Sequence, residues 1–451
     1  HTPQLMVDGK KILPVIHLAA AGYPLEDNAT IKLHDTGIKI FEIGINESFF
    51  YLAPGKYDFS KLERSASRLL HLLPDAKLIV NFQSRAMAKW CKENPDECIG
   101  YATGPIEPVC RDERIGRALR PSAASPKFRQ ETVNQVLAFA DYIKKQPWGK
   151  RVIGFRVSYG IYTEWHTYGM YEAPDTGIRM TEAFREYLRK KYGDDVSLQK
   201  AWGHKEITLK NVQVPGVSKR RHPGNILLDP VRDRAVLDYY DCHANVQADF
   251  LLELAKTIKN RFPDKLCGAY YGYVFTAHPP EGCNILLDKV LQSPYIDFLS
   301  DPASYSTVSR LAGGDFSHRT VTSTFRRYGK LAFLEDDTRF HLIRNFKDVV
   351  HAARNAVESN AIVLRNICNM YFNGSAIQIA DAEYGRYSRP HSFDDPGVLK
   401  NLKQVFSILN QLQSAPKDSG NDTAVVIDYR ERLKADGLAW KVYSYNILNQ
   451  Y

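Results

Sequence analysis

Glu164 stands in a setting where a carboxyl group can do chemistry. It lies just past the apolar run Val152–Val157, in a segment rich in glycine and aromatic residues that also holds Trp165 and His166. Short apolar runs bounded by glycine are typical of buried parallel strands, and α/β barrels carry their chemistry just past such strands. Aromatic neighbours disfavour the charged form of a carboxyl group and so suit a general acid. The alternative is a loop glutamate in a surface salt bridge.

A second acidic stretch has the same form. The apolar run Leu331–Leu334 leads directly into Glu335, Asp336 and Asp337. Two strand-end carboxylates in one chain strengthen the catalytic interpretation of each. Arg339 follows closely and could keep Glu335 ionised, or it could pair with one of the two aspartates instead.

Eight strand candidates alternate with helical patterns and would position both stretches. This alternation predicts an α/β fold, a (β/α)8 TIM barrel. The strands are expected at 11–22, 38–45, 77–83, 152–157, 266–275, 295–305, 331–337 and 375–381. The helices are expected at 27–37, 58–73, 126–145, 181–192, 232–261, 345–360 with a continuation to 370, and 397–413.

The chain of 451 residues is expected to divide unequally. We predict a barrel over residues 1–413, with insertions near 84–121 and 201–230, because both stretches are long and irregular. Residues 414–451 are expected to hold a linker and the start of a flavodoxin-like α/β domain, whose first strand would be Ala424–Ile427.

Composition argues against several classes of function. The net charge is +9, but the basic residues are scattered and only 219–222 and 325–330 are tight clusters, so nucleic acid is not an expected partner. No apolar run approaches the ~20 residues of a membrane span. The opening HTPQLMVDGK lacks the pattern of a signal peptide. If His1 is a mature N-terminus, a soluble periplasmic or secreted location is favoured.

Neither the cysteines nor the histidines predict a metal site or another cofactor. There are seven cysteines without CxxC spacing, so a disulfide framework is not expected. Cys91, Cys98 and Cys110 lack an evident fourth zinc ligand, and their role stays open. A metal-dependent hydrolase using Glu335 and its neighbours would need histidines at other strand ends, and only His17 is so placed.

Several motifs resemble clan A glycoside hydrolases, with family 42 β-galactosidases the most similar. They are APGKYDFSKLE (53–63), the strand-end Glu164, FREYLRKKYGDDVSLQKAWG (184–203) and GKLAFLEDD (329–337). The chain's end resembles the start of the flavodoxin-like trimerisation domain of those enzymes. The resemblance implies a TIM barrel, a carbohydrate substrate and assembly into a trimer.

The resemblance also implies roles for the two glutamates. Retaining glycosidases use one carboxyl group as acid/base and a second as nucleophile, about 5–5.5 Å apart. Glu164 would be the acid/base and Glu335 the nucleophile, with Asp337 a weaker candidate for the latter. Thr163 stands where these enzymes have Asn, so the sugar stays open between a β-galactoside and a β-mannoside.

Sugars bind through aromatic faces and paired polar groups, and strand-end residues of these types are candidate contacts. For each of them a structural role is an equal alternative. The expected substrate-binding residues are Tyr271, Asp301, Tyr305, Trp165, Asp337, Arg339 and Asn46, with His17, Glu47, Gln83, Arg85, Tyr273 and Asp381 as further candidates.

Two alternatives to a neutral β-glycosidase remain open. One is a non-catalytic carbohydrate-binding barrel, which the presence of both glutamates disfavours. The other is a glycosidase for an anionic sugar, uronate or sulfated, which Arg319, Arg326 and Arg327 could meet.

Overall fold

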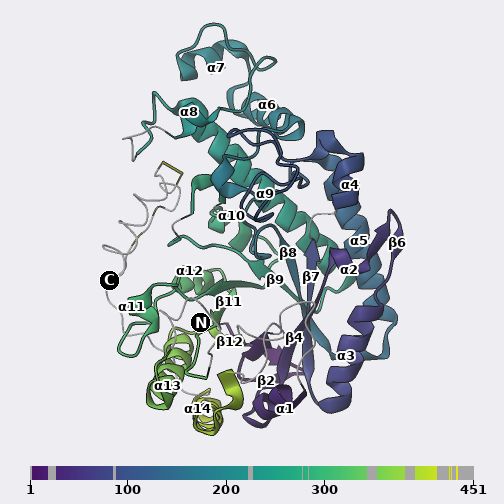
Figure 1. Ribbon diagram of the computed structural model, residues 1–451, viewed down its shortest axis with the longest axis vertical. Helices are drawn as coiled ribbons and strands as arrows, with labels where there is room; N and C mark the ends of the chain where they lie inside the picture. The colour runs from purple at the N-terminus through teal and green to yellow at the C-terminus, as the bar shows by residue number, and fades with distance from the viewer. Residues whose placement is uncertain are drawn as a thin grey trace.

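The computed structural model describes residues 3–18, 27–84, 88–221, 227–276, 278–282, 284–342, 353–380 and 392–413, together with 426, 428, 433 and 434. Within these residues, eight parallel strands close into one barrel, which confirms the predicted fold (Figure 1). In barrel order they are β3 (Val15–Leu18), β4 (Ile40–Asn46), β7 (Lys77–Ser84), β8 (Val152–Tyr159), β9 (Leu266–Tyr270), β10 (Phe298–Pro302), β11 (Leu331–Asp336) and β12 (Ala376–Ala380).

Helices connect successive strands and cover the outside of the barrel. The strands are buried on both faces, as parallel strands between a packed interior and a helical layer must be. The main connecting helices are α1 (Asp27–Asp35), α3 (Ser60–Leu72), α5 (Pro126–Lys145), α9 (Arg234–Arg261), α10 (Leu287–Leu291), α12 (Thr322–Arg327) and α13 (Ala356–Phe372), and α14 (Pro396–Leu412) follows the last strand.

Two connections are enlarged by the predicted insertions. In Figure 1 helices α6, α7 and α8 lie together beyond α9, at the end of the molecule away from α1, α13 and α14. The short elements are α2 (Glu47–Phe50), β5 (Tyr51–Ala53), β6 (Lys56–Tyr57), α4 (Ala88–Glu93), η1 (Pro95–Glu97), η2 (Pro147–Arg151), η3 (Met170–Glu172), α6 (Ile178–Tyr192), α7 (Asp195–Trp202), α8 (Val217–Arg220), η4 (Pro280–Gly282), α11 (Thr307–Arg310) and η6 (Ser392–Asp394).

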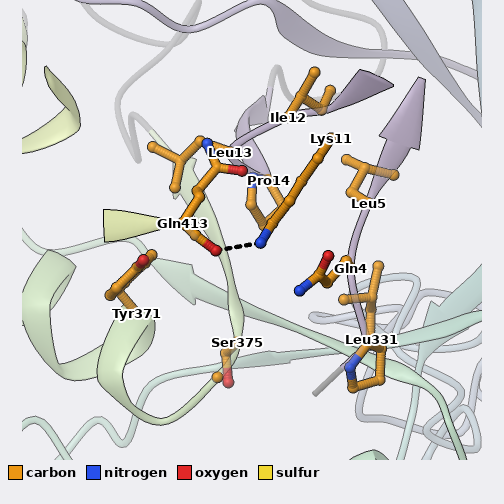
Figure 2. A pocket seen from close by; sticks show the side chains of 12 residues that line it. Gln4, Leu5, Lys11, Ile12, Leu13, Pro14, Leu331, Tyr371, Ser375 and Gln413 are labelled. Carbon is orange, nitrogen blue, oxygen red and sulfur yellow. Dashed lines mark hydrogen bonds between the residues drawn. The ribbon is translucent and has the colours of Figure 1, made fainter. Parts of the chain in front are cut away.

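The amino-terminal end of the barrel is closed by a hairpin of β1 (Met6–Val7) and β2 (Lys10–Lys11). Beside it lies a pocket lined by residues that begin β11 and precede β3 and β12, among them Leu331, Pro14 and Ser375 (Figure 2). Lys11 Nζ donates a hydrogen bond to the Gln413 carbonyl across this pocket. The pocket therefore lies at the barrel end opposite to Glu164 and Glu335.

The barrel interior holds a layer of polar side chains from alternate strands: Glu42 of β4, Arg156 of β8, Ser300 of β10 and Gln378 of β12. Arg156 Nη2 lies 2.8 Å from Glu42 Oε2 and donates to Gln378 Oε1 at 2.8 Å, and Nη1 donates to Ser300 Oγ at 2.5 Å. Layers of four side chains from alternate strands are the usual filling of such barrels. Because Glu42 and Arg156 are buried, these contacts must offset their loss of hydration.

Several predicted boundaries need correction. β9 ends at Tyr270 rather than 275, because the chain turns at Gly272, whose φ is 95°. α13 begins at Ala356, where Asn355 accepts a hydrogen bond from Glu358 N and caps the helix. The proposed second domain falls almost entirely outside the described residues. No described helix is long and apolar enough to cross a membrane.

Candidate active site

Glu164 sits in a tight loop that follows β8. Four residues of this loop have positive φ angles: Gly160 (81°), Tyr162 (55°), Thr163 (69°) and Trp165 (60°). Such angles cost a non-glycine residue about 1–3 kcal/mol, so the loop needs compensating contacts. Trp165 N donates to the Tyr159 carbonyl at 2.8 Å, and Ile161 N donates to the His166 carbonyl at 2.9 Å. A Cβ atom at Gly160 would collide with that carbonyl.

Trp165 anchors this loop from the inside. Its side chain is fully buried, its indole N–H donates to the Val157 carbonyl at 3.1 Å, and its ring packs against Tyr159 and Phe250. This burial gives Trp165 a packing role in place of the substrate contact expected from the sequence.

The Glu164 carboxyl group remains partly accessible, with 17% of the side chain exposed. Its Oε2 lies 3.6 Å from His166 Nε2 and 3.9 Å from Arg319 Nη2. The loop is further held because Asn284 Nδ2 donates to the Glu164 carbonyl at 2.8 Å. Backbone and side chain of Glu164 are therefore held by different neighbours.

Glu335, near the end of β11, rests on the polar layer of the barrel. Its Oε2 accepts hydrogen bonds from the Tyr270 hydroxyl and, at 3.1 Å, from Gln378 Nε2. Gln378 uses its oxygen for Arg156, so a continuous chain of contacts runs from Glu42 to Glu335. Burial and the charge of Asp337 raise the pKa of Glu335 to about 8.

Asp337, two residues on, is in the opposite electrostatic state. Arg310 Nη2 lies 2.6 Å and Arg339 Nη1 2.9 Å from its carboxylate, and the Tyr305 hydroxyl donates to it at 2.8 Å. Burial alone would raise the pKa of Asp337, but the two arginines outweigh it and bring the pKa to about 2. Asp337 is therefore ionised, and its charge favours a proton on Glu335.

Asp336 points the other way. Its oxygens accept from Thr338 N at 3.0 Å and from Asn366 Nδ2 of α13 at 2.9 Å. Alternate side chains of a strand point to opposite faces, so Glu335 and Asp337 share the barrel side while Asp336 binds the helical layer.

Asp301 and Arg319 link the two carboxyl groups. Arg319 N donates to Asp301 Oδ2 at 2.8 Å, and the Arg319 guanidinium carbon lies 4.4 Å from the ring centre of Tyr273 and 5.3 Å from that of Tyr305. Burial raises the pKa of Asp301 to about 7, against the lowering effect of Arg319. The site thus runs from Glu164 through Arg319 and Tyr305 to Asp337 and Glu335.

The structure separates the other expected substrate contacts. Tyr305 is 42% exposed and sits beside Asp337, so it can offer a ring face to a ligand. Tyr271 is fully buried and its hydroxyl accepts from Leu286 N, which is a packing role. Asn46 ends β4, is nearly buried and accepts from the Ser48 hydroxyl. Arg85 and Asp381 lie outside the described residues.

Sequence reasoning missed four residues that build the site: Tyr270, Gln378, Arg310 and the side chain of His166. Tyr270 and Gln378 were within expected strands, and only the register of those strands decides which side chains face inward. Arg326 and Arg327 end α12, which leads to the start of β11, so they lie away from the strand ends that carry the site.

Within the described residues, no group of three or more His, Cys, Asp or Glu side chains could hold a metal ion. Burial lowers the pKa of His17 to about 4, and Cys91 and Cys98 are buried together without an assigned role.

Comparison with known proteins places the fold. No protein-family model matches the chain, and a search of curated proteins finds no match. Among solved structures, the β-galactosidase of the psychrophilic Marinomonas ef1 matches with a TM-score of 0.63 at 15% identity, over 88% of this chain and 60% of that one. A catalytic mutant of the family 42 β-galactosidase of G. stearothermophilus matches with a TM-score of 0.61 at 14% identity, over 96% and 60%.

The same barrel also occurs in an enzyme of another activity. The catalytic domain of a β-amylase from Paenibacillus polymyxa matches with a TM-score of 0.61 at 13% identity, over 88% of this chain and 98% of that one. This chain has the barrel fold of these glycosidases, and the predicted likeness to family 42 is confirmed at the level of fold. It spans about three fifths of the length of the two β-galactosidases.

Proposed function

We propose that this protein is a retaining exo-β-glycosidase that hydrolyses a terminal β-linked sugar, with a β-galactoside or β-mannoside as substrate. The observation that carries the proposal is the pair of carboxyl groups at the ends of β8 and β11. They share one end of the barrel, and the Glu164 charge is close enough to raise the pKa of Glu335. The neighbouring glycosidase structures support the same reaction class.

In the proposed first step, Glu164 donates a proton to the glycosidic oxygen while Glu335 attacks the anomeric carbon. The bond to the leaving group breaks and a covalent glycosyl-enzyme forms. Tyr270 and Gln378 both bind Oε2 of Glu335, which leaves Oε1 for the attack. In the second step Glu164 takes a proton from water, which displaces Glu335 and restores the β configuration.

Asp337, Tyr305 and Arg339 are proposed to bind the sugar. An ionised carboxylate accepts hydrogen bonds from sugar hydroxyls, and Tyr305 can stack on the ring. Arg310, Arg319 and Arg339 each already face a carboxylate, so the positive charges are balanced. This balance favours a neutral sugar over an anionic one. Assembly into a trimer stays a prediction from the resemblance.

A panel of p-nitrophenyl glycosides tests the reaction class. We expect cleavage of the β-galactoside or β-mannoside, slower cleavage of the β-glucuronide, and release of the β-anomer by NMR. Cleavage with release of the α-anomer would replace retention by inversion. Binding of a sugar without cleavage of any glycoside would favour the non-catalytic barrel.

The state of Glu335 predicts an alkaline requirement for the first step. A 2,4-dinitrophenyl 2-deoxy-2-fluoro-β-glycoside needs no acid, so its rate of inactivation reports only the ionised nucleophile. With a pKa of about 8, Glu335 is mostly protonated below that pH, and inactivation should slow as pH falls. Asp337→Asn removes the negative charge and should move this limb to lower pH by roughly one unit.

Asp336→Asn is the matched control, because that carboxylate faces α13. It should leave the limb in place. A limb that stays put in Asp337→Asn, or moves to higher pH, contradicts the proposed coupling.

A further inference from the structure

Two side chains of opposite character approach the same oxygen of Glu164. His166 Nε2 lies 3.6 Å and Arg319 Nη2 3.9 Å from Oε2. Both distances exceed the ~3.2 Å limit of an N–H···O hydrogen bond. Neither nitrogen has a hydrogen-bond partner among the described residues, although both are buried. A small rotation of the carboxyl group could complete one contact or the other.

The protonation pattern of the His166 ring follows from its other nitrogen. Nδ1 lies at hydrogen-bond distance from the Gly282 carbonyl. A carbonyl only accepts, so Nδ1 carries the hydrogen and Nε2 of the neutral ring offers a lone pair. The segment bearing Gly282 is fixed in turn, because Arg220 of the insertion lies 3.3 Å from the buried carboxylate of Glu281.

Arg319 is held just as firmly. Nε donates to the Pro302 carbonyl at 3.0 Å and lies 3.5 Å from Asp301 Oδ1, and the guanidinium group lies over the Tyr273 ring. These contacts occupy one side of the guanidinium and direct Nη2 toward Glu164. A fixed cation and a fixed lone pair therefore flank one carboxyl oxygen.

We propose that His166 and Arg319 divide the two protonation states of Glu164 between them. The protonated carboxyl group donates its hydrogen to His166 Nε2, and the carboxylate accepts a hydrogen bond from Arg319 Nη2. This inference rests on the proposed function, in which Glu164 is an acid in the first step and a base in the second. Both are positioning residues, since they act through Glu164.

Other charged and titratable groups also face this pair. Glu164 interacts electrostatically with Tyr273, Asp301 and Glu335 in addition to Arg319. The His166 ring contacts the rings of Tyr273 and His278, with centroids 5.4 and 4.6 Å away. A test must therefore isolate Glu164 from the other groups.

The trapped glycosyl-enzyme provides that isolation. In it Glu335 is esterified and cannot titrate, so hydrolysis depends on the ionisation of Glu164. The protein is inactivated with 2,4-dinitrophenyl 2-deoxy-2-fluoro-β-galactoside, excess reagent is removed, and the rate of reactivation is followed across pH. Reactivation should slow below the pH at which Glu164 takes up a proton.

Opposite shifts are expected for the two neighbours. His166→Asn keeps a donor near Gly282 but loses the acceptor, which should move the acidic limb to lower pH by about half to one unit. Arg319→Met loses the cation and should move the limb to higher pH by about one unit. His166→Gln and Arg319→Lys, which restore an acceptor and a charge, should lie closer to wild type.

His71→Asn and Arg327→Met are matched controls on the exposed surface and should leave the limb unchanged. Shifts in the same direction, or no shift in either variant, overturn this inference alone. Failure of the wild type to form a glycosyl-enzyme overturns the proposed function and this inference with it.

Discussion

Replacing Glu335 with alanine is expected to lower kcat/KM for the cleaved β-glycoside on the order of 10⁵-fold, as removal of a covalent nucleophile does in other enzymes. The substitution empties the position beneath the anomeric carbon while Tyr270, Gln378 and Arg156 remain. Azide can enter this space and attack in place of the carboxylate. The product should then be a glycosyl azide of inverted configuration.

Glu335→Gln complements this variant because it keeps the shape of the side chain and can still contact Tyr270. It should be equally inactive but should not be rescued by azide, because the space stays filled. Asp336→Ala removes a neighbouring acid that faces away from the barrel interior and should retain most activity. More than about a hundredth of the wild-type rate in Glu335→Ala would remove it from the nucleophile's role.

Replacing Glu164 with alanine should have a smaller effect that depends on the leaving group. General acid catalysis contributes about 10²–10⁴-fold, so a p-nitrophenyl or alkyl glycoside should lose roughly that factor. The first step with a dinitrophenyl glycoside should change little, because that leaving group needs no proton. The second step still lacks its base, so glycosyl-enzyme should accumulate and azide should release a glycosyl azide of retained configuration.

Glu206→Ala is the matched control, since that glutamate is exposed on the insertion. It should behave like the wild type with every leaving group. Equal losses for good and poor leaving groups in Glu164→Ala would contradict an acid/base role and would indicate general damage to the loop.

The barrel could be predicted because strands and helices leave periodic patterns. Eight apolar runs gave the eight strand positions, and Glu164 and Glu335 lie at the expected strand ends. Alternation within a strand also accounts for the inward Glu335 and Asp337 and the outward Asp336. What periodicity could not supply was the point at which each strand stops.

Tyr271 illustrates the cost of that gap. The strand was expected to run to Phe275, which made Tyr271 a strand-end candidate. β9 stops at Tyr270, which binds Glu335, while Tyr271 packs in the core. A shift of one residue exchanges the two faces of a strand, so the neighbouring tyrosine holds the functional position.

The remaining site contacts join segments far apart in the chain. His166 is fixed by Gly282, and Glu335 by Gln378. No local pattern marks such pairs, because they arise only when the barrel closes. Trp165 shows the converse, since an aromatic residue beside a candidate acid turned out to be a core anchor of the loop.

The most direct test of the central claim is to identify the residue that bears the sugar. The protein is labelled with 2,4-dinitrophenyl 2-deoxy-2-fluoro-β-galactoside, digested, and mapped by tandem mass spectrometry. We predict one equivalent of label, attached to Glu335. A label on Asp337, on a residue elsewhere, or on none while a β-glycoside is turned over would contradict the proposed mechanism.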